Sequence, residues 1–60
     1  SIQAEMAGSK LLDDAKDLVK RGKYQKAAKI YATLAKSKKY AGSAAQKEAE
    51  IRLQEIKKYL

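Results

Sequence analysis

Residues 22–35 read GKYQKAAKIYATLA, and this stretch decides the fold of the chain. Its apolar residues recur at the three- and four-residue spacings that place side chains on one face of an α-helix. The expected face consists of Tyr24, Ala27, Ala28, Tyr31, Leu34 and Ala35. Gly22 can adopt the left-handed conformation that commonly ends a helix. The stretch therefore predicts a helix over 23–38, entered from a tight turn that follows another helix.

That preceding helix is expected over residues 9–21. Ser9 is a suitable N-cap, and Asp13 and Asp14 favour the positive end of the helix. Residues 1–6, which are followed closely by Gly8, are expected either to fray or to form a short extension of this helix. Its apolar stripe comprises Leu11, Leu12, Ala15, Leu18 and Val19. Because the turn at Gly22 is short, the two helices should fold back as an antiparallel hairpin.

A third helix is expected over residues 44–59. Ser43 and Gln46 have the spacing of a capping box, in which the two residues bond each other's backbone at a helix start. The predicted apolar face comprises Ala45, Ala49, Leu53, Ile56 and Leu60. No stretch alternates with the period of a β-strand. We therefore expect one all-α domain over residues 1–60, a three-helix bundle, and its start at Ser1 suggests a domain excised from a longer protein.

The composition argues against an enzyme and against a bound cofactor. The chain has no cysteine and no histidine, which removes the usual ligands of zinc and haem and the commonest catalytic base and thiol. Asp13, Asp14 and Asp17 cluster within about one turn, but acidic residues near a helix start explain them better than a metal site. No apolar run approaches the roughly 20 residues of a membrane span.

The hairpin resembles the tetratricopeptide repeat, a helix pair with small and aromatic residues at fixed positions. The matching residues are Ala15, Leu18, Gly22, Tyr24, Ala27, Tyr31 and Leu34. The connector Lys39-Tyr40-Ala41-Gly42-Ser43 is similar to one found in bacterial cell-envelope repeats, with Ala41 in place of the usual proline. A shift of 34 residues places Ala49 on Ala15, so the resemblance implies that the third helix caps the repeat.

Such a helical module is expected to bind a protein or peptide. The net charge of +7 favours an acidic partner, which could also be part of the same parent chain. By analogy with helical repeats, the first helix should line the binding groove. The partner-binding residues predicted on it are Lys10, Asp14, Asp17 and Arg21.

Two alternatives remain open at this stage. The lysine-rich face of the second helix and its connector could bind nucleic acid without sequence preference, with an aromatic ring available for stacking. The residues expected to contact phosphates are Lys26, Lys29, Lys36, Lys38, Lys39 and Tyr40. In the other alternative the chain is a structural module that self-associates, with Ile51, opposite the apolar face of its helix, as the contact.

Overall fold

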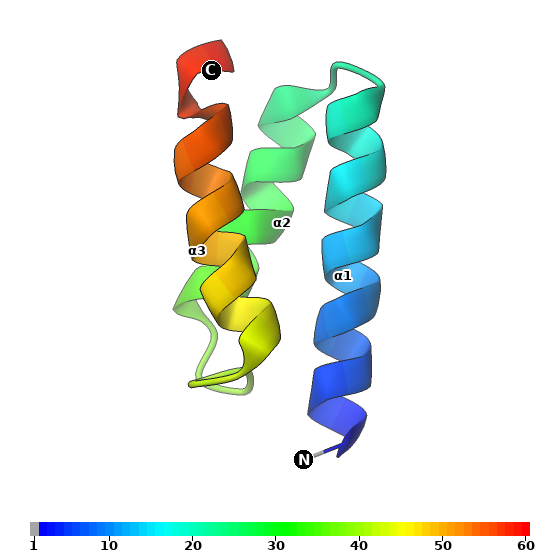
Figure 1. Ribbon diagram of the computed structural model, residues 1–60, viewed down its shortest axis with the longest axis vertical. Coiled ribbons are helices and arrows are strands. Elements are labelled where there is room, and N and C mark those ends of the chain that lie inside the picture. The colour runs from blue at the N-terminus through cyan, green and yellow to red at the C-terminus, as the bar shows by residue number, and fades with distance from the viewer. Residues whose placement is uncertain (1) are drawn as a thin grey trace.

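The computed structural model describes the backbone of residues 2–60 and the side chains from Glu5 onward. Three helices follow one another in the chain: α1 (Ile2–Lys20), α2 (Tyr24–Lys36) and α3 (Ala44–Ile56) (Figure 1). A single 3₁₀ turn, η1 (Lys57–Tyr59), continues α3. No strand occurs in residues 2–60. The predicted all-α three-helix bundle is confirmed.

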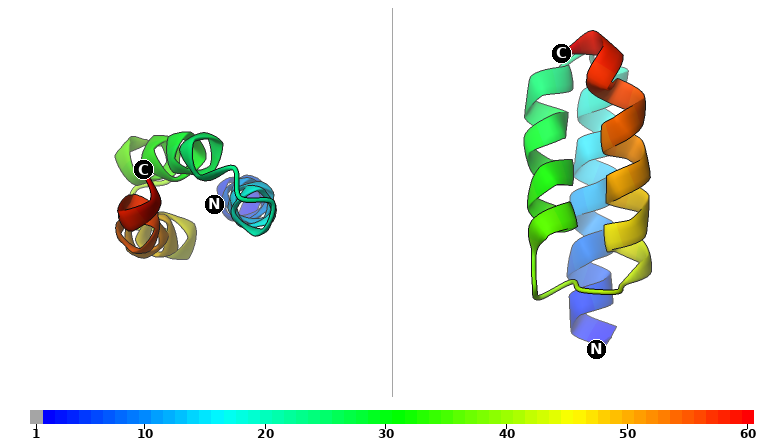
Figure 2. Two further views of the ribbon diagram at one scale, coloured as in Figure 1. Left: turned by 90° about the horizontal axis from the view of Figure 1, so that it is seen from above. Right: turned by 90° about the vertical axis from the view of Figure 1, so that its left-hand side faces the viewer.

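Successive helices run antiparallel, and seen from above α2 adjoins both α1 and α3 (Figure 2). Both α1 and α3 lie along α2, and they approach each other less extensively across one side of it. The core is small. Its buried residues are Leu12, Ala15, Ala27, Tyr31, Leu34, Tyr40, Ala45, Ala49 and Ile56. Half-buried residues of the predicted apolar faces pack against this core: Leu11, Leu18, Val19, Ala28 and Leu53. Most of the predicted faces are thus confirmed, but Leu60, at 55% exposure, lies outside the core because α3 ends at Ile56.

The turn between α1 and α2 is closed by Gly22. Its φ of 77° lies in the left-handed region, where a residue with a Cβ atom is strained. The N–H of Gly22 donates to the carbonyl of Val19 at 3.0 Å, and that of Lys23 donates to Leu18 at 2.8 Å. This pair of bonds is the Schellman motif. The predicted role of Gly22 as a helix stop is confirmed.

The first helix starts earlier than residue 9, which confirms for residues 2–6 the alternative that this segment extends the helix; Ser1 lies outside the described residues. The helix runs without interruption from Ile2 to Lys20, so Ser9 lies inside a helix and the prediction that it is an N-cap is wrong. Gly8 does not end the helix, because it lies buried where α1 packs against α3. A Cβ atom at Gly8 would lie only 2.8 Å from Cβ of Ala45 and 3.4 Å from the ring of Tyr40. Gly8 therefore serves close helix packing and does not break the helix.

We expect Gly8→Ala to destabilise the domain. Alanine favours an isolated helix over glycine by about 1 kcal/mol, but overpacking at a 2.8 Å approach commonly costs about 1–3 kcal/mol. Thermal unfolding followed by circular dichroism should give a lower Tm than the wild type. The double variant Gly8→Ala/Ala45→Gly removes the clash and should be more stable than the sum of the two single effects. A higher Tm for Gly8→Ala alone would contradict this packing.

The start of α3 is tied to the end of α2, and it confirms the predicted capping box only in part, because the Gln46 side chain bonds the N–H of Gly42 and not that of Ser43. The N–H of Gln46 donates to the hydroxyl of Ser43 at 3.1 Å, which confirms the N-cap. The Gln46 side chain accepts from the N–H of Gly42 at 2.9 Å. Its Nε2 donates across to the carbonyls that end α2, those of Leu34, Ala35 and Ser37, at 3.1–3.2 Å. One side chain thus satisfies backbone groups at two helix ends.

Candidate functional site

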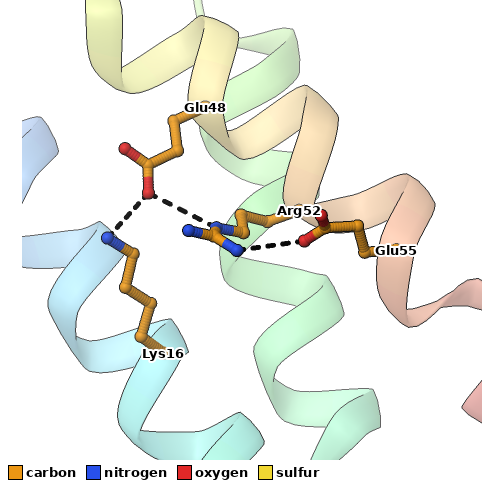
Figure 3. A network of polar contacts seen from close by, with 4 residues as sticks. All are labelled: Lys16, Glu48, Arg52 and Glu55. Carbon is orange, nitrogen blue, oxygen red and sulfur yellow. Dashed lines mark hydrogen bonds and ion pairs between the residues drawn. The ribbon is translucent and has the colours of Figure 1, made fainter.

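A network of charged side chains joins α1 to α3. Nζ of Lys16 lies 2.6 Å from Oε2 of Glu48, and the same oxygen lies 3.4 Å from Nε of Arg52. Arg52 also reaches Oε1 of Glu55 at 3.1 Å (Figure 3). The hydrogen bond from Lys16 lowers the pKa of the Glu48 carboxyl, so this group is ionised at neutral pH. The network holds the side chains of Lys16 and Arg52 at the boundary between α1 and α3.

Beside this network a shallow groove of about 240 Å³ lies between α1 and α3. Three of its residues are cationic, one is acidic, and the remainder are apolar or aromatic. Its lining consists of Lys16, Val19, Lys20, Tyr31, Arg52, Glu55 and Ile56. Burial raises the pKa of the Tyr31 phenol, although Arg52 and Lys16 oppose the shift, so the hydroxyl stays protonated at neutral pH. The groove therefore offers cations, a neutral phenol and a small apolar surface together.

The four predicted partner-binding residues lie elsewhere, three of them on α1 and Arg21 in the turn that follows it. They form two exposed ion pairs: Lys10 Nζ to Asp14 Oδ2 at 3.7 Å, and Arg21 Nε to Asp17 Oδ2 at 3.1 Å. With 3.6 residues per turn, this stripe faces about 130° away from Lys16 around the helix, and none of the four lines the groove. The structure brings them together in pairs on the outer face of α1.

Sequence reasoning missed the groove residues Lys16, Lys20 and Arg52. Helical spacing does predict the pair of Glu48 with Arg52, which are four residues apart, and the structure confirms that pair. Lys16 of α1 lies far from Glu48 in the sequence, and no local pattern predicts the contact between them. A packed arrangement of α1 and α3 was needed to find this group.

The residues expected to contact phosphates divide into two sets. The lysines at positions 26, 29, 36, 38 and 39 are all exposed. Tyr40 is buried at 8% exposure and packs near Gly8, so the prediction that its ring is free for stacking is wrong. Tyr40 is buried, although its connector is expected to be exposed, because α1 extends far enough to cover the ring. Half-buried Tyr24 instead stacks on Tyr59, with ring centroids 4.4 Å apart and planes inclined by 17°.

Ile51, the predicted self-association contact, is 60% exposed. The residues one helical turn before and after it, Lys47, Gln54 and Glu55, are exposed and polar. An isolated exposed isoleucine is normal on a monomeric protein and forms no continuous apolar patch. Ile51 thus provides little surface for a stable dimer.

Two further kinds of feature, a metal-binding cluster and a membrane-spanning helix, are absent from the described residues. Among residues 2–60, no three His, Cys, Asp or Glu side chains come together where they could hold a metal ion. None of the described helices has the length and apolar character needed to cross a membrane. Comparison with protein-family models, with curated proteins and with solved structures finds no match to this chain. The resemblance to the tetratricopeptide repeat therefore depends on the matching residues alone and stays a prediction.

Proposed function

We propose that this domain is a non-catalytic helical module that binds a protein or peptide through the groove between α1 and α3. The observation that supports this most directly is the composition of the groove. Three cations lie there beside Val19, Ile56 and the neutral phenol of Tyr31, whereas Glu55 is the one acidic residue in the lining. Such a surface suits an acidic segment that also carries an apolar side chain.

The groove is a better candidate than the outer face of α1. Each of the four outer residues is neutralised by its neighbour, with side chains more than half exposed, and exposed pairs of this kind contribute little binding energy. In the groove, Lys16 and Arg52 are also paired, with Glu48 and Glu55. Lys20 enters no ion pair in the part of the chain described, so its charge is available to a ligand. The positive field of the domain, with a net charge of +7, should also speed association with an acidic partner.

Selection of peptides from a displayed random library, followed by affinity measurement, tests this proposal. We expect the selected peptides to be rich in Asp and Glu around an apolar residue. Lys20→Glu places a negative charge in the groove and should weaken their binding by about tenfold, equivalent to about 1.4 kcal/mol. Lys10→Glu makes the same charge change on the outer face and should have an effect below about threefold.

The opposite ranking would contradict the groove. Peptides that tolerate Lys20→Glu but lose affinity on Lys10→Glu would place the site on the outer stripe of α1. Backbone amide shifts on titration of a selected peptide provide an independent readout, since they should cluster at Lys16, Lys20 and Arg52. Failure of selection to enrich any binder would overturn peptide binding altogether.

A further inference from the structure

Acidic residues are absent from α2 and from the turns on either side of it. All seven acidic residues lie at or before Asp17 or at or after Glu48. Every charged residue between these two positions is a lysine or arginine. The acidic side chains therefore belong to α1 and α3, and α2 with both its flanking turns carries positive charge only.

The fold keeps this charge on one outer face. Lys26, Lys29 and Lys36, which we call the lysine ridge, are exposed on α2, while its opposite side packs into the core through Ala27, Tyr31 and Leu34. The ion pairs found in the described residues involve side chains of α1, of α3 and of Arg21 in the turn after α1, and none involves a lysine of the ridge. At a rise of about 1.5 Å per residue the ridge spans about 15 Å. Its cations are thus available to a linear polyanion.

Two stacked tyrosine rings, Tyr24 and Tyr59, form an aromatic platform at one end of the ridge. The ring of Tyr59 stacks on Tyr24 yet remains 51% exposed, and Nζ of Lys58 lies 5.2 Å from the Tyr59 centroid. Both rings border an open hollow of about 440 Å³ between the start of α2 and η1. The hollow also includes Lys26, so the platform and the ridge are continuous. This end lies at the top of Figure 1, where the chain leaves η1.

We propose that α2 binds single-stranded nucleic acid, with phosphates along the lysine ridge and a base stacked on Tyr59. Lysines that contact only phosphates give binding without sequence preference. A base of any kind can stack on an aromatic ring once it is unpaired, which favours a single strand over a duplex. This site is separate from the groove between α1 and α3, because none of its residues lines that groove.

A membrane surface fits these observations less well. A helix that lies in a lipid interface inserts an apolar face between the lipids. The apolar face of α2 is already buried in the core, and Thr33 lies between Lys29 and Lys36 on the exposed side. The ridge can therefore supply charge to a ligand but no large apolar group.

Fluorescence anisotropy of a labelled 20-nucleotide oligo-dT tests the ridge. We expect saturable binding at 50 mM salt that weakens by roughly 20-fold at 200 mM if three phosphates are contacted. The triple variant Lys26→Gln/Lys29→Gln/Lys36→Gln should bind at least about tenfold more weakly and lower the salt slope by about 2. The control triple Lys10→Gln/Lys20→Gln/Lys47→Gln removes the same charge from α1 and α3 and should retain binding within about threefold. Equal losses in both triples would overturn the assignment to α2.

Tyr59 tests the stacked base. Tyr59→Ala should weaken oligo-dT binding by about fivefold or more, whereas Tyr59→Phe keeps the ring and should bind as the wild type does. Circular dichroism melting of both variants checks that the fold survives the loss of the contact with Tyr24. Equal affinity of the two Tyr59 variants would overturn stacking. Equally tight binding of poly-glutamate, or binding to phosphatidylserine vesicles but not to oligo-dT, would overturn nucleic acid as the ligand.

Discussion

Tyr31→Ala is expected to abolish the folded state of this domain at room temperature. Tyr31 is 1% exposed and is one of the two largest fully buried side chains, together with Leu34. Truncation of a buried aromatic residue to alanine typically costs about 3–5 kcal/mol. A single core in a chain below about 70 residues rarely supplies more than about 3–5 kcal/mol. The loss is therefore comparable to the whole stability of the protein.

Circular dichroism at 222 nm and thermal melting measure this effect. The wild type should show a helical spectrum and a cooperative transition, and Tyr31→Ala should show neither. Tyr31→Phe is the matched control, because it keeps the ring in the core and removes only the hydroxyl that borders the groove. It should melt within a few degrees of the wild type. A helical, cooperatively melting Tyr31→Ala protein would mean that the core does not depend on this ring.

The second largest effect is expected for Gln46→Ala. The Gln46 amide donates to three carbonyls at the end of α2, and its oxygen accepts from Gly42 before α3. Removal of one partner from partly buried hydrogen bonds leaves backbone groups unsatisfied, which costs about 1–3 kcal/mol. The connection between α2 and α3 should then open more easily than the rest of the domain.

Urea unfolding gives the stability change, and amide hydrogen exchange shows where it acts. We expect a lower midpoint for Gln46→Ala, with faster exchange concentrated at residues 37–46. Gln46→Glu is expected to be at least as destabilising, because a carboxylate cannot donate to the carbonyl oxygens of Leu34, Ala35 and Ser37. Gln54→Ala, an exposed glutamine on the same helix, should change the midpoint little. A midpoint unchanged by Gln46→Ala would contradict the role of this side chain.

Local rules predicted most of the fold. The apolar spacing in residues 22–35 identified α2, and the left-handed preference of glycine identified the turn at Gly22. The spacing of Ser43 and Gln46 identified the start of α3. Each of these signals acts between residues a few positions apart, so no knowledge of packing was needed.

Gly8 and Tyr40 are where local rules failed. By helix propensity Gly8 marks a weak point, and Tyr40 in a lysine-rich connector looks exposed. In the folded protein α1 continues through Gly8, and the missing side chain lets this helix approach Ala45 closely. Tyr40 packs beside Gly8 and is buried there. These outcomes depend on contacts between residues far apart in the chain.

The candidate sites likewise depend partly on patterns among neighbouring residues and partly on contacts between separate helices. The sequence by itself determined that this is a small all-α chain without the ligands of common metal sites, with all acidic residues outside α2. Only the tertiary structure decided that Lys16 meets Glu48, that Gln46 joins two helix ends, and that Tyr59 stacks on Tyr24. Periodicity and capping are properties of neighbouring residues, whereas a groove or an aromatic stack exists only once separate helices have packed.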